Sequence, residues 1–502
     1  MSFSRSKRPG LVKISIVLFW VAMTALMIVR ERAAATDPVV GGSYGSSALS
    51  GDESWMGMYY KDKTNDRLVK IGYSVTSKKQ LDSGWLFSES GRMKINVQGS
   101  TQTIRTDTRA ITDADYLLRY FQFEMISDLV KFKLDGRVED GNKILLNIET
   151  GGGTTRKETI DLDQAPAMQL NIMDRLLALG LEQGKSYELP FFDPSTMSNE
   201  TITVQALGLE NVEDGGKTLR VWHLQWDYKG IAIDSWIDER GNSLREETDT
   251  FLTVRESREK ALGEGWDDSA SLDLVREMAV PVSTEIPNPR KAERMQVKIA
   301  GVPFDTYPLN DWRQRAEFGE LITVQIENLD EIQDPYILPY RGEELTADLA
   351  ATAMIQSDHP AIRNAAKDII GDQTDPLRAA RKINDWVHDN LKKEPVTSIP
   401  SAYDVLIIKK GDCNEHTVLT VALARAAGIP ARVLVGLVYH QGAFYYHAWP
   451  AVWVGRWVAI EPTFGQFPAD ATHIKLLEGD LDKQVDLIQI MGKVRIEVMD
   501  VK

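Results

Sequence analysis

Cysteine is nearly absent from this chain, since Cys413 is the single cysteine among 502 residues. One thiol excludes an internal disulfide, so the fold must be stabilised by hydrophobic cores. A thiol left unpaired in an exported protein is a candidate for a reactive group. The position of this residue in the fold is therefore the first question that the sequence raises.

Runs of basic residues are also lacking after residue 32, and the formal net charge is −15. A chain of this charge repels phosphate backbones, so we expect no nucleic-acid partner. The hydrophobic content of 43% and the charged content of 26% are ordinary for globular proteins. At this length, the chain is expected to fold into about three domains.

Long apolar runs are limited to residues 14–29, ISIVLFWVAMTALMIV. With the apolar residues just before it, this run has about the ~17–25 residues of a membrane-spanning helix. Basic residues ahead of it place the N-terminus in the cytoplasm. Arg30 and Arg32 follow directly, which favours an uncleaved anchor over a signal peptide cleaved within residues 31–36. Residues 1–36 therefore predict a single-pass anchor in the cytoplasmic (inner) membrane, with soluble domains in the periplasm or outside the cell.

Residues 37–52 are rich in glycine and serine and predict a flexible spacer. Residues 53–260 then show strand patterns separated by turn signals, interrupted by one helix expected at 166–179. The Gly-Gly-Gly sequence at 151–153 lacks the following helix and Lys-Ser/Thr pair of a phosphate loop, and predicts a hairpin tip. We expect an antiparallel β-rich domain, formed by one large curved sheet with a helix lying on it.

The first strand segments of this domain, in WMGMYYKDKTNDRLVKIGYSV (55–75), resemble sheet domains beside hydrolase domains in exported bacterial proteins. Some of those domains are similar to lipoprotein carriers. The resemblance leaves the ligand of the β-rich domain open: the sheet can bind a lipid, contact a partner, or space the next domain.

Residues 261–342 predict a connecting β module with a pair of strands. From residue 343 to 502 the pattern changes. Helices are expected at 359–371 and 375–393, and a third begins at Cys413 and stops at Gly428. Strands follow, so this part predicts an α+β domain.

Cys413 stands where free N–H groups and the helix macrodipole favour an anion. We expect this position to lower the pKa of the thiol below the free value of ~8.5. Taken alone, a cysteine among apolar neighbours is more often an inert core residue. A metal site formed with His416, His440 and His447 is disfavoured, because Cys-x₂-His without a second close pair is poor zinc spacing. No metal and no cofactor are therefore expected.

Strands expected at 431–440, 444–454 and 456–461 carry the partners that a thiol enzyme needs. His447 lies in the second strand and Glu461 ends the third. A hairpin centred on Val454 sets these two residues opposite each other, whereas a two-residue turn after it shifts them by about three residues. The sequence leaves this register open. Three nearby tryptophans are expected to serve packing: Trp449, Trp453 and Trp457.

The segments GDCNEHTVLTVALARAAGIPARVLVGLVY and HAWPAVWVGRWVAIEPTFGQ resemble the transglutaminase-like superfamily of bacterial proteins. The resemblance covers roughly residues 345–475 and implies a papain-like fold with a Cys-His-Asp arrangement. It implies that Cys413 is the nucleophile and His447 the base. Glu461 occupies the place of the usual aspartate, which is a departure from the family pattern.

The sequence thus predicts an exported, membrane-anchored thiol enzyme that acts on a peptide or isopeptide bond of a peptide or protein substrate. Hydrolysis by a cysteine peptidase or amidase is favoured over amine transfer by an acyltransferase. Two alternatives remain. The domain can be a catalytically decayed binding or scaffold module, or the β-rich domain can be a carrier to which the last domain only docks.

Overall fold

The computed structural model describes most of the chain after residue 52. The expected anchor (1–36) and spacer (37–52) lie outside the described residues. Within the part that is described, no helix is long and apolar enough to cross a membrane. The described residues are 53–502 except for 63–65, 98–99, 128–130, 150–154, 196, 229–230, 264–278, 318–319, 333–335, 395–400, 480–486 and 488–489.

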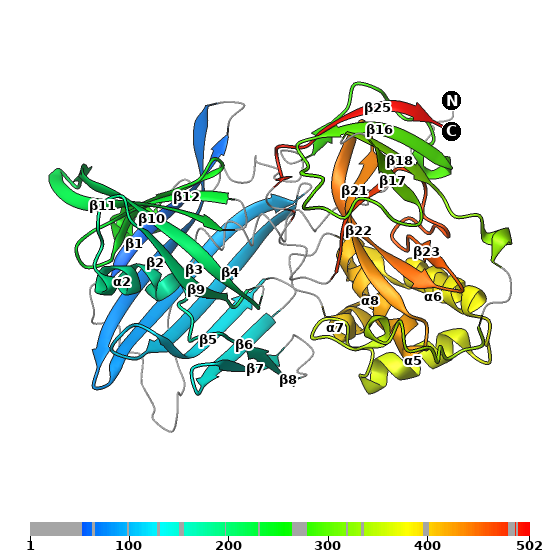
Figure 1. The fold of residues 1–502 in the computed structure, drawn as a ribbon, viewed down its shortest axis with the longest axis horizontal. Coiled ribbons are helices and arrows are strands. Elements are labelled where there is room, and N and C mark those ends of the chain that lie inside the picture. Colours follow the sequence, from blue (N-terminus) through cyan, green and yellow to red (C-terminus); the bar gives the residue numbers. More distant parts are fainter. Residues whose placement is uncertain are drawn as a thin grey trace, which may run out of the picture.

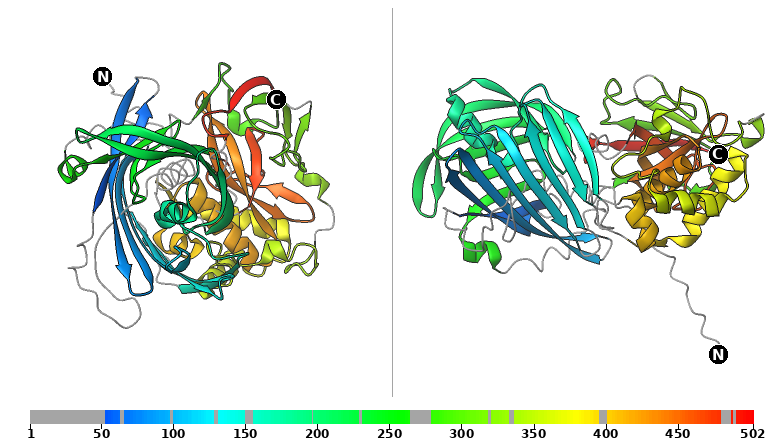
Figure 2. Two further views of the ribbon diagram at one scale, coloured as in Figure 1. Left: turned by 60° about the vertical axis from the view of Figure 1, so that its left-hand side comes forward. Right: turned by 90° about the horizontal axis from the view of Figure 1, so that it is seen from below.

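The first part of the described chain is one antiparallel sheet of fourteen strands, in the order β8-β7-β6-β5-β4-β3-β2-β1-β14-β13-β12-β11-β10-β9. Figures 1 and 2 show that the sheet is strongly curved. The strands are β1 (Ser54–Asp62), β2 (Arg67–Leu81), β3 (Gly84–Val97), β4 (Ser100–Thr112), β5 (Leu118–Ile126), β6 (Lys131–Glu139), β7 (Lys143–Glu149), β8 (Thr155–Asp161), β9 (Ser186–Asp193), β10 (Ser198–Asp214), β11 (Lys217–Tyr228), β12 (Ile231–Ile237), β13 (Ser243–Glu247) and β14 (Phe251–Glu256).

Alternating apolar residues give this sheet its buried face. In β5, Phe121, Phe123 and Met125 are buried, while Gln122 and Glu124 between them are only partly covered. The helix α2 (Gln169–Leu179) packs on β3 and β9 and ends at Gly180, whose φ is 78°. The triple glycine at 151–153 lies outside the described residues, between two strands that pair as a hairpin.

The second part holds a smaller five-stranded sheet, a four-stranded sheet and a layer of helices. The five-stranded sheet has the order β15-β22-β21-β24, with β23 paired to β22, and the four-stranded sheet has the order β17-β18-β16-β25. The strands are β15 (Val280–Pro281), β16 (Arg294–Ala300), β17 (Gln314–Glu317), β18 (Leu321–Gln325), β21 (Ala431–His440), β22 (Ala443–Trp453), β23 (Trp457–Ala459), β24 (His473–Glu478) and β25 (Arg495–Val501). The helices of the described chain beyond α2 are α3 (Arg258–Leu262), α5 (Pro360–Ile370), α6 (Pro376–Asn390), α7 (Ala402–Ile408) and α8 (Cys413–Ala426), with short 3-10 turns η2 (Pro289–Lys291), η3 (Leu329–Glu331) and η4 (Ala347–Leu349).

Residues 261–342 share both sheets with the end of the chain. β16 pairs with β25, and β15 pairs with β22, so each sheet combines strands from before and after residue 343. Side chains add to this connection, because Gln314 bonds to the backbone of Lys475 through both its amide oxygen and its amide nitrogen. The stretch expected as a connecting module is thus built into the same unit as the domain that follows it.

The helix α8 is the centre of this unit. Asp412 caps its N-terminus, and the Asp412 N–H donates to the Glu415 carboxylate, which completes a capping box. The helix stops before Gly428, whose φ of 79° only glycine adopts freely. All residues from Cys413 to Ala424 are buried, because α5, α6 and α7 pack around one side and β22 covers another. A two-residue pair of parallel strands, β19 (Lys392–Lys393) and β20 (Lys410–Gly411), leads into it.

Candidate active site

Cys413 is the first residue of α8, as the sequence predicts, and its side chain is fully buried. The N–H groups of this first turn point toward the region in front of the helix. The helix α8 packs directly against β22, the strand that carries His447. The helix of the cysteine and the strand of the histidine are therefore adjacent elements.

Two carboxyl groups flank the thiol in sequence. Burial, and next the charge of Glu415, raise the pKa of Asp412 well above its usual value. A raised pKa favours the neutral form of Asp412, which still accepts a hydrogen bond from the Asn414 N–H at 3.2 Å. Neutral Asp412 adds no negative charge beside the thiol, and it shares a side-chain hydrogen bond with Cys413. The charge of Glu415 opposes a thiolate at this position, whereas the helix macrodipole favours one.

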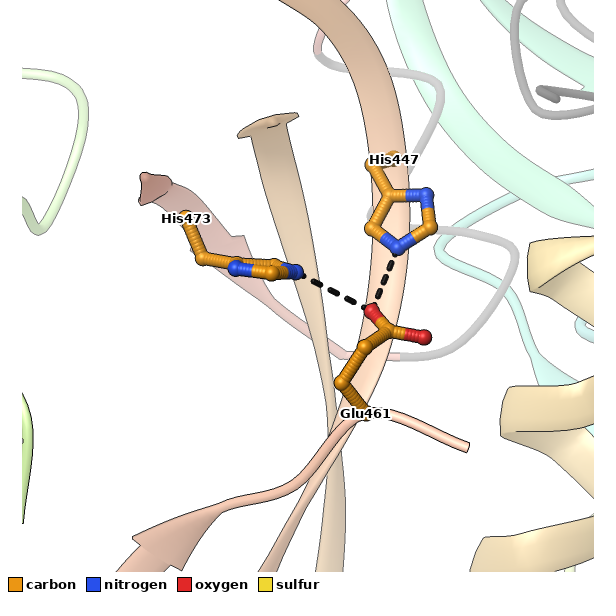
Figure 3. Close-up of side chains that lie close together, drawn as sticks. All are labelled: His447, Glu461 and His473. Carbon is orange, nitrogen blue, oxygen red and sulfur yellow. Dashed lines mark hydrogen bonds and ion pairs between the residues drawn. The ribbon is translucent and has the colours of Figure 1, made fainter. Parts of the chain in front are cut away.

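His447 and Glu461 are brought together by a hairpin that differs from both registers considered above. Trp453 pairs with Trp457 and Ala451 with Ala459, so the hairpin is centred on Gly455. In this register the position opposite His447 is residue 463, two residues beyond the glutamate. The side chain of Glu461 is long enough to close this gap. Its Oε2 lies 2.6 Å from His447 Nε2 (Figure 3).

The contact fixes the tautomer of His447. A carboxylate oxygen only accepts, so Nε2 carries the proton and Nδ1 is left as the acceptor. Nδ1 is buried, has no hydrogen-bond partner within the described chain, and points away from the carboxylate in Figure 3. The ring is held between Phe464, whose ring centroid is 5.4 Å away at an interplanar angle of 9°, and Trp449 at 6.0 Å. Burial lowers the pKa of His447, so the neutral base is favoured.

Glu461 accepts four hydrogen bonds, which is the full capacity of a carboxylate. Its Oε1 accepts from the N–H groups of Thr463 at 2.7 Å and Phe464 at 3.3 Å. Its Oε2 accepts from His447 and also from His473 Nε2, at 3.1 Å. Burial opposes ionisation here, but the two histidines outweigh it, and the pKa of Glu461 lies well below its usual value. The group is an ionised carboxylate.

His473 is the site residue that the sequence reasoning missed. It opens β24, pairs with Val438 across the sheet and is 1% exposed. A histidine at the head of an apolar strand, in a chain with 7 histidines, is the one signal that could have drawn attention to it.

The three side chains also offer the donor types of a metal site. Ligand atoms of His447, Glu461 and His473 all lie within 4.8 Å of one another. Around tetrahedral zinc, with bonds of ~2.0–2.1 Å, ligand atoms stand about 3.3 Å apart. The 2.6 Å between His447 Nε2 and Glu461 Oε2 is a hydrogen-bond length instead, so the geometry fits a shared proton. The four residues considered from the sequence as metal ligands, Cys413, His416, His440 and His447, do not form such a cluster. His416 bonds to the Asp412 carbonyl, and His440 packs on Tyr445.

His416 gives a pH-dependent prediction. Its Nδ1 donates to the Asp412 carbonyl oxygen at 2.5 Å, while its Nε2 is buried without a partner in the described chain. Burial lowers the pKa of His416 to about 4, below the unfolded value of ~6.5. Protonation therefore favours the unfolded state, and stability present above pH 6.5 is lost as the pH falls toward 4. Between pH 7 and pH 5 this residue should cost about 2 kcal/mol of unfolding free energy.

The measurement is urea unfolding at both pH values for the wild type, His416→Gln and Thr420→Ala. The glutamine variant should lose less stability than the wild type on acidification, by about 2 kcal/mol. Thr420→Ala, which changes a buried and non-titrating residue of the same helix, should keep the full pH dependence. Equal pH dependence in all three proteins would show that His416 is not held neutral.

The site combines a cysteine at the start of a buried helix with a histidine on the strand β22. The ring of that histidine is oriented by a carboxylate two residues beyond the end of β23, and these are the elements of a papain-like thiol site. Residues 363–462 match the family model of the Transglutaminase-like superfamily, and this range includes Cys413, His447 and Glu461. The chain thus contains a transglutaminase-like domain at residues 363–462.

An uncharacterised protein of Haemophilus influenzae is 33% identical over 112 residues, which cover 19% of this chain and 30% of that protein. The chain therefore spans less than a third of that relative. Among solved structures, a proposed cysteine protease from Cytophaga hutchinsonii is 16% identical and covers 42% of this chain and 86% of its own, with a TM-score of 0.29. A β-barrel-like protein from Brucella abortus is 17% identical and covers 40% and 95%, with a TM-score of 0.32. TM-scores this low do not establish a shared fold.

Proposed function

We propose that the protein is a thiol enzyme that cleaves an amide bond of a peptide or protein through Cys413, His447 and Glu461. The observation that carries the proposal is the 2.6 Å bond from His447 Nε2 to Glu461, which leaves Nδ1 as an unpaired base on the strand that packs against α8. This is the nitrogen that a neighbouring thiol needs as proton acceptor.

The reaction follows from these roles. His447 Nδ1 takes the Cys413 proton, and the thiolate attacks the carbonyl carbon to form a tetrahedral oxyanion. We assign the Cys413 backbone N–H, at the helix start, as a donor to that oxyanion. As the C–N bond breaks, His447 returns the proton to the leaving amine, and a thioester to Cys413 remains. Water, deprotonated by the same imidazole, then releases the acid and restores the thiol; an amine in place of water gives acyl transfer.

We propose that residues 1–36 anchor the enzyme in the inner membrane, with its domains outside the cytoplasm.

We also propose that the enzyme hydrolyses the amide bond and does not transfer the acyl group to an amine. A peptide mixture incubated with the protein should gain new α-amino termini, and a fluorescent primary amine should not be incorporated. Incorporation of the amine without new termini would assign the protein to acyl transfer. Neither product, in a protein that is folded and has a free thiol, would contradict the enzyme proposal.

One observation favours a second candidate, a binding or scaffold module without catalysis. The Cys413 side chain is 0% exposed, so a substrate carbonyl can reach the sulfur only after neighbouring groups move. In a site that has lost catalysis, the thiol would serve only as a buried packing residue of the hydrophobic core. The amide assay separates the two candidates, because the module predicts no product from any peptide.

A further inference from the structure

The imidazole of His473 faces hydrogen-bond acceptors at both nitrogens. Nε2 lies 3.1 Å from Glu461 Oε2, and Nδ1 lies 3.1 Å from the Asp470 carbonyl oxygen and 3.3 Å from Asp470 Oδ1. An unprotonated ring nitrogen is itself an acceptor and would set its lone pair against these oxygens, so the contacts are favourable only when both nitrogens carry protons. The geometry therefore requires an imidazolium in a site that is closed to solvent.

Asp470 is itself held in place on its remaining sides. Its Oδ1 accepts from the Thr472 N–H at 2.8 Å and the Thr472 hydroxyl at 2.5 Å, and its Oδ2 accepts from Arg290 Nη1 at 2.7 Å. Arg290 belongs to the 3-10 turn η2 and lies over the ring of Phe464, 4.2 Å from its centroid. Phe464 in turn stacks on His447. This network of contacts therefore starts at His447, the proposed base, and returns to it.

The charges of the four ionic groups in this network balance. Glu461 and Asp470 are negative, His473 and Arg290 are positive, and three of the four groups are 0–1% exposed. A buried carboxylate paired only with His447 would draw a proton onto that ring. Because His473 already supplies a positive charge to Glu461, the carboxylate does not require His447 to be protonated as well.

We propose that His473 is a positioning residue of the catalytic site, whose imidazolium holds Glu461 in place and keeps His447 neutral and ready to accept the thiol proton. The inference rests on the proposed function, in which His447 is the base. Glu461 and Asp470 face His473 directly, the His447 ring lies 5.6 Å away, and Arg290 stands behind Asp470.

The electrostatic directions agree with this geometry. Burial opposes the charge of His473, but the two carboxylates outweigh burial and raise its pKa. Burial likewise opposes ionisation of Asp470, yet the histidine and Arg290 lower its pKa to about 2. The positive charge on His473 adds to burial in lowering the pKa of His447. Removing that charge should make His447 more basic.

The test is a histidine titration followed by NMR in full-length protein labelled at the imidazole rings, with signals assigned by single His→Gln variants. In the wild type, His473 should show two protonated nitrogens at pH 7. In His473→Gln, which keeps a donor toward Glu461 but removes the charge, the His447 midpoint should rise by about one pH unit. His440→Gln, on the neighbouring strand β21, should leave it unchanged.

Three outcomes would overturn the proposal. The first is a neutral His473 in the wild type, and the second is an unchanged His447 midpoint in folded His473→Gln. The third is a stoichiometric divalent metal in the purified protein that is lost in His473→Gln, which would make the cluster a metal site. A shifted His447 midpoint in a protein that hydrolyses no amide would keep the network and contradict the proposed reaction instead.

Discussion

Replacing Cys413 with alanine is expected to reduce amide turnover by at least about 10⁴-fold. The alanine has no lone pair to attack the carbonyl, so no thioester forms and the two-step route is lost. The small loss of side-chain volume at the start of α8 should leave the fold intact, because the two hydrogen bonds of the capping box join Asp412 and Glu415 to backbone N–H groups that the alanine keeps. The measurement is kcat/KM on an amide that the wild type cleaves.

Thr420→Ala is the matched control for this change, since Thr420 is equally buried on the same helix. It should retain wild-type turnover within a few-fold. If Cys413→Ala kept the activity of the wild type, the nucleophile would have to be sought elsewhere, and the thiol would be a packing residue.

Replacing Glu461 with glutamine is expected to lower kcat by about 10⁴-fold, the size of effect that a misoriented catalytic histidine produces. Glu461 accepts four hydrogen bonds, from two histidines and from the N–H groups of Thr463 and Phe464. An amide has one oxygen, so its NH₂ group must face either the histidines or the backbone donors. Either choice releases His447 from its Nε2–H tautomer or displaces the side chain.

The variant Glu461→Asp tests the length of the side chain separately from its negative charge. Because the hairpin is centred on Gly455, the side chain must extend back toward His447, and the shorter aspartate is about 1.5 Å short of both oxygen positions. We expect activity between that of the wild type and that of Glu461→Gln. Full activity in Glu461→Asp would show that the backbone adjusts, and full activity in Glu461→Gln would remove the carboxylate from the mechanism.

Local signals were sufficient for α5, α6 and the start of α8, whereas α7 (Ala402–Ile408), which also packs on α8, was not predicted. Pro360 and Gly371 mark the two ends of α5, and Asp375 caps α6 by accepting from the Arg378 N–H. Cys413 stands at the first position of α8, as its neighbours Gly411 and Asp412 indicate. Each of these features depends on residues within one or two turns, which is why sequence alone identifies them.

The carboxylate network could not be read from the sequence, because its members meet only through tertiary contacts. Arg290 and Asp470 are 180 positions apart and are joined by a single ion pair. The register that places Glu461 two residues short of the position opposite His447 depends on a three-residue turn, and turn length at Gly455 has no unique signature. The order of the fourteen-stranded sheet likewise depends on long-range pairing, above all that of β1 with β14.

The pairing of Cys413 with His447 is tested most directly by the rate of iodoacetamide alkylation as a function of pH, in the wild type and in His447→Gln. The measurement requires no knowledge of the substrate, and the chain has one thiol to label. We predict a midpoint below the ~8.5 of a free cysteine in the wild type, and a higher midpoint once the imidazole is removed. The same midpoint in both proteins, at or above ~8.5, would contradict the assignment of Cys413 and His447 as nucleophile and base.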